Sequence, residues 1–348
     1  MNKKSAAVPM RSKRNSSRLL GVVKTSIFFL LLNVCIFALP VDFDVIVVGS
    51  SPIPLIEALY HHHNGKRVLV LEGSTVCGGA WKSIEICGHF PVDLGCHTLG
   101  NDKQMLHFLE DYVGCNMVSM DNPHLPFDAR HSANGFYFAH GCYEIIHNLI
   151  ELIAKTDIVF LLDHPLESVF IQENEPIAIV KTKDRQFTTS KILVTPYSHI
   201  ELDNPHTAPA KKEKMKFYHL YMLIEDMTPP RFSFRTGVGK GISRLMNLTP
   251  FVGINGTGTQ LMVFQTYGDF YLQPADIYLD ILKKNDLIDA SARVLKAENY
   301  IYEQEHFQLP GNLKNADLVF EVLKTNHIQD MSNYIAKWKQ VLQPFTPK

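Results

Sequence analysis

The sequence predicts an α/β fold that opens with a strand, a helix and a second parallel strand. Residues 42–49 form a continuous apolar run that ends in glycine, which is typical of a strand buried on both faces of a parallel sheet. A helix-like stretch then extends to Tyr60, and a second apolar run occupies residues 67–71. The chain is 46% apolar and 20% charged. This globular composition excludes a disordered or coiled-coil protein.

The spacing within this unit is that of a Rossmann-like dinucleotide-binding motif. The tight turn after the first strand directs backbone N–H groups and a helix N-terminus toward a pyrophosphate. An acidic residue at the end of the second strand accepts hydrogen bonds from ribose hydroxyls. Gly49 ends the first strand, and Glu72 follows the second strand 23 residues later. We therefore expect both residues to bind the cofactor.

The glycine fingerprint of this motif is incomplete. Where G-x-G-x-x-G is expected, Ser51 takes the second glycine position and Pro54 takes the third. Ser51 adds a Cβ where the backbone approaches the phosphates, although its hydroxyl can also donate a hydrogen bond. Proline is tolerated in the first turn of a helix, where its missing N–H has no intrahelical partner. These residues alone are compatible with a dinucleotide site and with a unit that keeps the shape without the ligand.

Two further motifs follow Glu72. Gly78 and Gly79 form a glycine pair, and Asp93, Gly95 and His97 make up the pattern D-x-G-x-H. Residues 72–100 thereby resemble FAD-dependent oxidoreductases of the amine oxidase, protoporphyrinogen oxidase and UDP-galactopyranose mutase type. The resemblance implies a Rossmann-like FAD/NAD(P)-binding domain with an inserted α+β substrate domain, and redox chemistry on a small organic substrate. The implied cofactor-binding residues are Gly49, Ser51, Glu72, Gly78, Gly79, Trp81, Lys82 and Leu166, and His97 is the candidate catalytic residue.

The same resemblance implies a discontinuous domain plan. Residues 41–100 and 141–200 would form the nucleotide-binding domain, residues 101–140 and 205–300 the substrate domain, and residues 301–348 a C-terminal helical segment. Apolar periodicity predicts a helix at residues 141–155 and strands at residues 158–162, 167–172, 177–181, 191–195, 217–224 and 260–267.

Residues 1–40 differ in composition from the rest of the chain. They contain seven basic side chains and no acidic one, and an apolar run covers residues 26–39 with a single interruption at Asn33. Such a segment is typical of a signal peptide or of an uncleaved membrane anchor, which would place the protein in an exported or luminal location. The alternative is a soluble cytoplasmic protein. The remaining residues carry 27 basic and 35 acidic side chains, which argues against nucleic acid as a partner.

Two other classes of function stay open at this point. The fold could persist as a non-catalytic binding or scaffold protein that has lost its cofactor. Alternatively, the first unit could bind NAD(P), although Glu72 disfavours the 2′-phosphate of NADP. The spacing of the cysteines and histidines predicts no metal site.

Overall fold

The computed structural model describes residues 41–121, 135–204, 213–231, 233–239, 241–254, 258–267, 273–306, 309, 313–323 and 332–344. Residues Asp42–Lys348 form one compact unit. Among the described residues, no helix is both long enough and apolar enough to span a membrane. The predicted N-terminal targeting segment lies outside those residues and stays a prediction.

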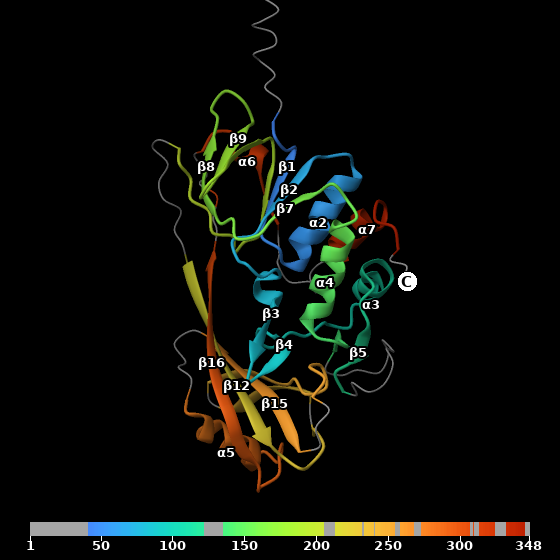
Figure 1. Ribbon diagram of the computed structural model, residues 1–348, viewed down its shortest axis with the longest axis vertical. Helices are drawn as coiled ribbons and strands as arrows, with labels where there is room; N and C mark the ends of the chain where they lie inside the picture. Colours follow the sequence, from blue (N-terminus) through green and yellow to red (C-terminus); the bar gives the residue numbers. More distant parts are fainter. Residues whose placement is uncertain are drawn as a thin grey trace, which may run out of the picture. The chain divides into compact units, whose positions relative to one another are not determined.

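One of the two large sheets of this unit is a five-stranded parallel sheet (Figure 1). Its strand order is β17-β11-β1-β2-β7, and all four pairings are parallel. Every residue of β1 and β2 is buried, which explains why both strands read as continuous apolar runs. The five strands are β1 (Val45–Val48), β2 (Val68–Leu71), β7 (Val159–Leu161), β11 (Ile192–Val194) and β17 (Phe320–Val322).

Different layers cover the two faces of this sheet. Val45 and Val47 of β1 pack into a core cluster with residues of α2 (Pro52–His63) and α4 (Cys142–Ile153), which lie side by side in Figure 1. The alternate residues Ile46 and Val48 pack instead against the antiparallel strands β8 (Leu166–Ile171) and β9 (Ala178–Thr182), beside which β10 (Gln186–Thr189) completes a three-stranded sheet. A strand alternates its side chains, so one short apolar run supplies both cores.

A second, antiparallel sheet has the order β13-β14-β15-β12-β16. One face packs against α5 (Ala275–Lys284) through Leu220, Phe264 and Tyr278. The opposite face presents Tyr221 and Val263 to the main core cluster. The strands are β12 (Glu213–Glu225), β13 (Phe234–Gly239), β14 (Ile242–Asn247), β15 (Thr259–Tyr267) and β16 (Arg293–His306).

Shorter elements connect these layers. They are the 3-10 helix η1 (Gly79–Trp81), β3 (Ser83–Ile86), β4 (His89–Asp93), α3 (Lys103–Phe108), the π-helix η2 (Leu109–Val113), β5 (Met117–Ser119), β6 (Phe136–Phe138), α6 (Ala316–Val319) and α7 (Ser332–Lys339).

The predicted fold class is confirmed: the parallel sheet with its Rossmann-like unit and a separate antiparallel sheet are both present. The predicted helical character of residues 301–348 holds for α6 and α7 but is wrong for two other stretches of this segment. Residues up to His306 complete β16, and Phe320–Val322 form β17, which pairs with β11. Three strand residues are too few to show a period, and their backbone partners lie far away in the sequence. The division into cofactor and substrate domains stays a prediction.

Candidate functional site

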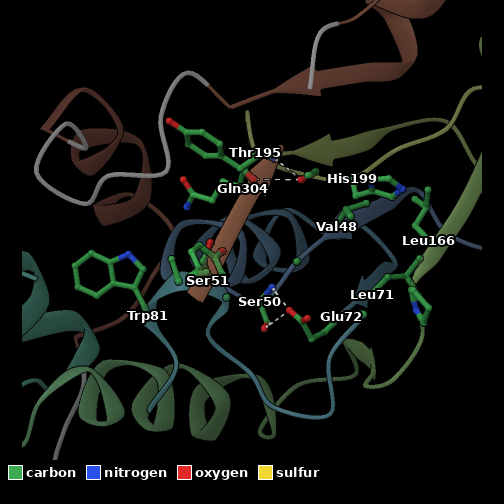
Figure 2. Close-up of a pocket in the computed structure, with 18 residues that line it drawn as sticks. Val48, Ser50, Ser51, Leu71, Glu72, Trp81, Leu166, Thr195, His199 and Gln304 are labelled. Atoms are coloured by element: carbon green, nitrogen blue, oxygen red, sulfur yellow. Dashed lines mark hydrogen bonds between the residues drawn. The ribbon is translucent and has the colours of Figure 1, made fainter. Parts of the chain in front are cut away.

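The carboxyl end of the parallel sheet borders a cavity of about 240 Å³ (Figure 2). Ligands of open α/β sheets generally bind at this end of the strands. Six of the eight predicted cofactor residues line the cavity, namely Gly49, Ser51, Glu72, Gly79, Trp81 and Leu166. The fold therefore brings together residues that are separated by up to 117 positions in the sequence.

Two glycines leave room for a ligand to approach the protein backbone closely. Gly49 has a φ of 96°, and a Cβ built on it would meet no atom within 4 Å. Gly79 has a φ of 57°, and its Cβ would lie 3.6 Å from the Cβ of Ser51. Both backbone conformations favour glycine. Any larger residue at either position would be strained and would occupy part of the cavity wall.

Glu72 is buried and accepts three hydrogen bonds from the chain itself. Its Oε2 atom accepts from the backbone N–H of Ser50 at 3.0 Å and from the Ser50 hydroxyl at 2.5 Å, as the dashed lines in Figure 2 show. Its Oε1 atom accepts from the Ser74 N–H at 2.8 Å. The Ser50 hydroxyl in turn accepts from the Gly78 N–H at 2.9 Å. Glu72 therefore connects the first glycine turn to the loop that follows β2.

The predicted residues Gly78 and Lys82 do not line this cavity. A Cβ on Gly78 would come within 2.8 Å of the Cα and N atoms of Lys82. Gly78 is therefore required by the turn of the chain. The Lys82 ammonium lies 5.8 Å from the centre of the Tyr300 ring. Their predicted roles in cofactor binding stay predictions.

His97 is not among the residues that line this cavity. Its Nε2 atom is 3.0 Å from the Ala80 carbonyl oxygen and 2.9 Å from the Leu94 carbonyl oxygen, so this nitrogen carries the hydrogen and donates it. The imidazole stacks on the Trp81 indole, with 4.5 Å between ring centres. These contacts indicate that His97 positions Trp81 against the cavity. A catalytic role for His97 stays a prediction.

Apart from Thr195 at the end of the predicted strand 191–195, sequence reasoning missed the rest of the cavity lining. Tyr302 and Gln304 reach it from β16, and the loop after β11 contributes Thr195, Tyr197, Ser198 and His199. No local motif marks Tyr302 and Gln304. They share one face of β16, because side chains alternate along a strand, but only the tertiary structure shows that this face meets the nucleotide motif.

Comparisons with known proteins agree with this architecture. Residues 47–112 match a family model described as an NAD(P)-binding Rossmann-like domain. A search of curated proteins gave no match.

Three solved structures share the fold. A candidate protoporphyrinogen oxidase from Exiguobacterium sp. is 10% identical, with 85% of this chain and 97% of that chain covered and a TM-score of 0.57. An oxidoreductase from Methanosarcina mazei is 13% identical, with coverage of 81% and 94% and a TM-score of 0.54. Reduced UDP-galactopyranose mutase is 9% identical, with coverage of 76% and 82% and a TM-score of 0.51.

The chain shares its fold with these two oxidoreductases and with the mutase, and it contains the Rossmann-like unit that the family model describes. The resemblance inferred from residues 72–100 is thus confirmed at the level of the fold.

The aspartate of the D-x-G-x-H motif is a buried residue that is hydrogen-bonded within the chain. Asp93 is 2% exposed and accepts hydrogen bonds from the Tyr137 hydroxyl, from the Cys142 N–H at 2.8 Å and from the Ser83 hydroxyl at 3.2 Å. The bond from Cys142 caps the first residue of α4. Asp93 therefore joins β4, β6 and α4 beneath the candidate site.

The ionisation of Asp93 should make folding stability depend on pH. Burial raises the pKa of Asp93 from 3.8 to about 6, because removal from water penalises the carboxylate. The native state then binds a proton more tightly than the unfolded chain. The stabilisation from Asp93 is complete below pH 4 and is lost as the pH rises through 6.

This loss can be measured as a difference between two proteins. The free energy of unfolding of the unmodified chain, relative to that of Asp93→Asn, should fall by roughly 2 kcal/mol between pH 4 and pH 7. Urea titrations at several pH values provide the measurement. A difference that is constant over this range would show that Asp93 ionises as it does in the unfolded chain.

Proposed function

We propose that this chain is a flavin-dependent oxidoreductase acting on a small organic molecule. The observation that carries the proposal is the convergence of six of the eight predicted cofactor residues on one cavity at the carboxyl end of the parallel sheet. The shared fold supports it. The open space beside Gly49 and Gly79 is what a closely approaching pyrophosphate needs.

Each part of the cavity would have its own task. The carboxylate of Glu72 would accept hydrogen bonds from ribose hydroxyls, and the turn at Gly49 and Gly79 would admit the pyrophosphate. The resemblance assigns the backbone near Leu166 to the adenine. Trp81 would form an apolar wall that excludes water. The bound flavin would supply the redox chemistry, and the protein would supply orientation and shielding.

A second candidate is a protein that keeps this fold without catalysis. It is favoured by two observations. The Glu72 carboxylate is already hydrogen-bonded by Ser50 and Ser74, and Pro52 and Pro54 remove N–H groups from the start of α2. A third candidate, dissociable NAD(P), fits the description of the matched family model. Titration with NADH and with FAD separates it from the flavin proposal.

The visible absorption spectrum tests the proposed function directly. The purified full-length chain should show flavin bands, or should acquire them on addition of FAD with a rise in melting temperature. The variant Gly79→Val should show neither, because its side chain is strained at a φ of 57° and fills part of the cavity wall.

Gly65→Val is the matched control. Gly65 has a φ of 73° in the turn after α2 and does not line the cavity, so its replacement adds similar strain without touching the candidate site. It should lose stability and keep flavin. A chain that shows no flavin bands and no response to FAD would instead support the non-catalytic candidate.

A further inference from the structure

The first turn of α2 offers few hydrogen-bond donors for an anion. Pro52 is the first residue of the helix and Pro54 the third, so two of the first three helical residues have no N–H. The first intrahelical bond runs from the Leu55 N–H to the Ser51 carbonyl oxygen at 3.2 Å. Only Ile53 within those three residues keeps an N–H. A pyrophosphate at this helix end would therefore lack donors that Rossmann-like motifs usually supply.

Basic side chains do not replace these donors. No lysine or arginine is among the residues that line the described cavity, and its one carboxylate is Glu72. The one histidine of the lining, His199, has its Nε2 atom 3.9 Å from the Glu201 carboxylate. Lys82, which the sequence suggested as a charge for the phosphate, lies over the Tyr300 ring instead. A dinucleotide with two negative phosphates would have to be held mainly by neutral hydrogen-bond donors.

The wall formed by β16 contains such donors. Tyr302 and Gln304 both line the cavity, together with Ser51 at the start of α2, and Figure 2 draws Gln304 and Ser51 around the same space. The Gln304 side-chain amide and the Tyr302 hydroxyl are neutral groups that can each donate a hydrogen bond. Burial raises the pKa of Tyr302, so its hydroxyl stays protonated and can donate. Ser51 makes no capping hydrogen bond with its side chain.

We propose that Tyr302 and Gln304 of β16 donate hydrogen bonds to the pyrophosphate of the bound dinucleotide, in place of donors that Pro52 and Pro54 remove from α2. This inference rests on the proposed function and goes beyond it, because it assigns phosphate recognition to the strand that connects the antiparallel sheet with the nucleotide cavity. The ligand class is a dinucleotide or a nucleoside diphosphate derivative. A ligand without phosphate would gain nothing from these two side chains.

Binding titrations on the full-length chain test the inference. FAD, ADP-ribose and adenosine are the probes, with Tyr302→Phe and Gln304→Leu as variants. Each variant should weaken binding of FAD and ADP-ribose by about tenfold, since a hydrogen bond to a charged group is lost, and should leave adenosine binding within about twofold. Tyr300→Phe is the control: it lies on the same strand, outside the cavity lining, and should bind all three probes as the unmodified chain does.

A gain of affinity provides an independent test. Pro54→Ala restores one N–H to the first turn of α2 and should tighten ADP-ribose binding by several-fold. In the Pro54→Ala variant, adding Tyr302→Phe should reduce ADP-ribose affinity by a smaller factor than it does in the unmodified chain. The reason is that the restored N–H and the Tyr302 hydroxyl donate to the same phosphates.

The outcomes separate the two proposals. If the unmodified chain binds FAD and ADP-ribose but the variants bind them equally well, or lose adenosine to the same extent, phosphate recognition by β16 is wrong and the proposed function stands. If the unmodified chain binds neither FAD nor ADP-ribose, the proposed function is wrong and this inference is wrong with it. Melting temperatures of all variants exclude misfolding as the cause of a loss.

Discussion

Replacing Lys337 by methionine should destabilise the chain by about 3 kcal/mol, the lower end of the cost of breaking a buried ion pair, because Glu57 is fully buried whereas the Lys337 side chain is 31% exposed. The Lys337 ammonium lies 3.0 and 2.9 Å from the two carboxylate oxygens of Glu57, which is fully buried in α2. The Trp338 indole N–H also donates to Glu57, at 2.9 Å. Lys337→Met would leave the carboxylate with an indole donor and no cation. Urea unfolding measures the loss.

A double variant distinguishes a lost ion pair from lost packing. Glu57→Leu combined with Lys337→Met removes both charges, so it should recover most of the stability that Lys337→Met loses. It should remain about 1 kcal/mol below the unmodified chain, because the Trp338 N–H loses its acceptor. If the double variant is as unstable as the sum of the two single variants, the buried charge is not the cause. The result matters for the candidate site, because α2 begins beside the cavity and this pair fastens α7 to it.

The second large effect is expected from Glu72→Gln. One carboxylate oxygen becomes an amide N–H₂ that must face either the donors of Ser50 or the N–H of Ser74. The free energy of unfolding should fall by roughly 2 kcal/mol, because a buried donor is left without an acceptor. FAD affinity should fall as well, since the ribose loses a charged acceptor. Thermal or urea unfolding and a flavin titration on the same samples measure both quantities.

Glu85→Gln is the matched control for this variant. Glu85 is exposed on β3, a short distance along the chain from Glu72, and its replacement should change stability by less than about 0.5 kcal/mol. If Glu72→Gln loses FAD affinity without losing stability, the hydrogen bonds to Ser50 and Ser74 contribute little to the fold. If it loses stability without losing FAD affinity, Glu72 is structural and the ribose assignment is wrong.

Local signals were sufficient for the first half of the site. The apolar run that becomes β1 ends at Gly49, and the run that becomes β2 ends at Glu72. Because the carboxyl ends of neighbouring parallel strands lie at the same edge, the two residues were expected close together, and both line one cavity. The amphipathic helix predicted at residues 141–155 corresponds to α4, since its buried side chains recur with helical spacing.

Long-range contacts account for what local signals missed. β17 consists of three residues whose strand character comes from pairing with β11, more than a hundred positions earlier. The packing of Gly95 is another case: its N–H donates to the Tyr221 hydroxyl at 2.8 Å, and a Cβ there would lie 2.7 Å from Nε2 of His219. The motif D-x-G-x-H marks the glycine. Only the antiparallel sheet packed against it explains why nothing larger fits.

The sequence by itself determined the βαβ unit, its first glycine and the acidic residue that follows its second strand, because hydrophobic period and turn chemistry act over a few residues. The tertiary structure decided which distant groups complete the cavity, bringing Tyr302 and Gln304 into the same lining as Ser51 and turning Lys82 toward Tyr300. The physical reason is that a strand or turn carries its own conformational preference, whereas the partner across a cavity depends on how whole sheets pack together.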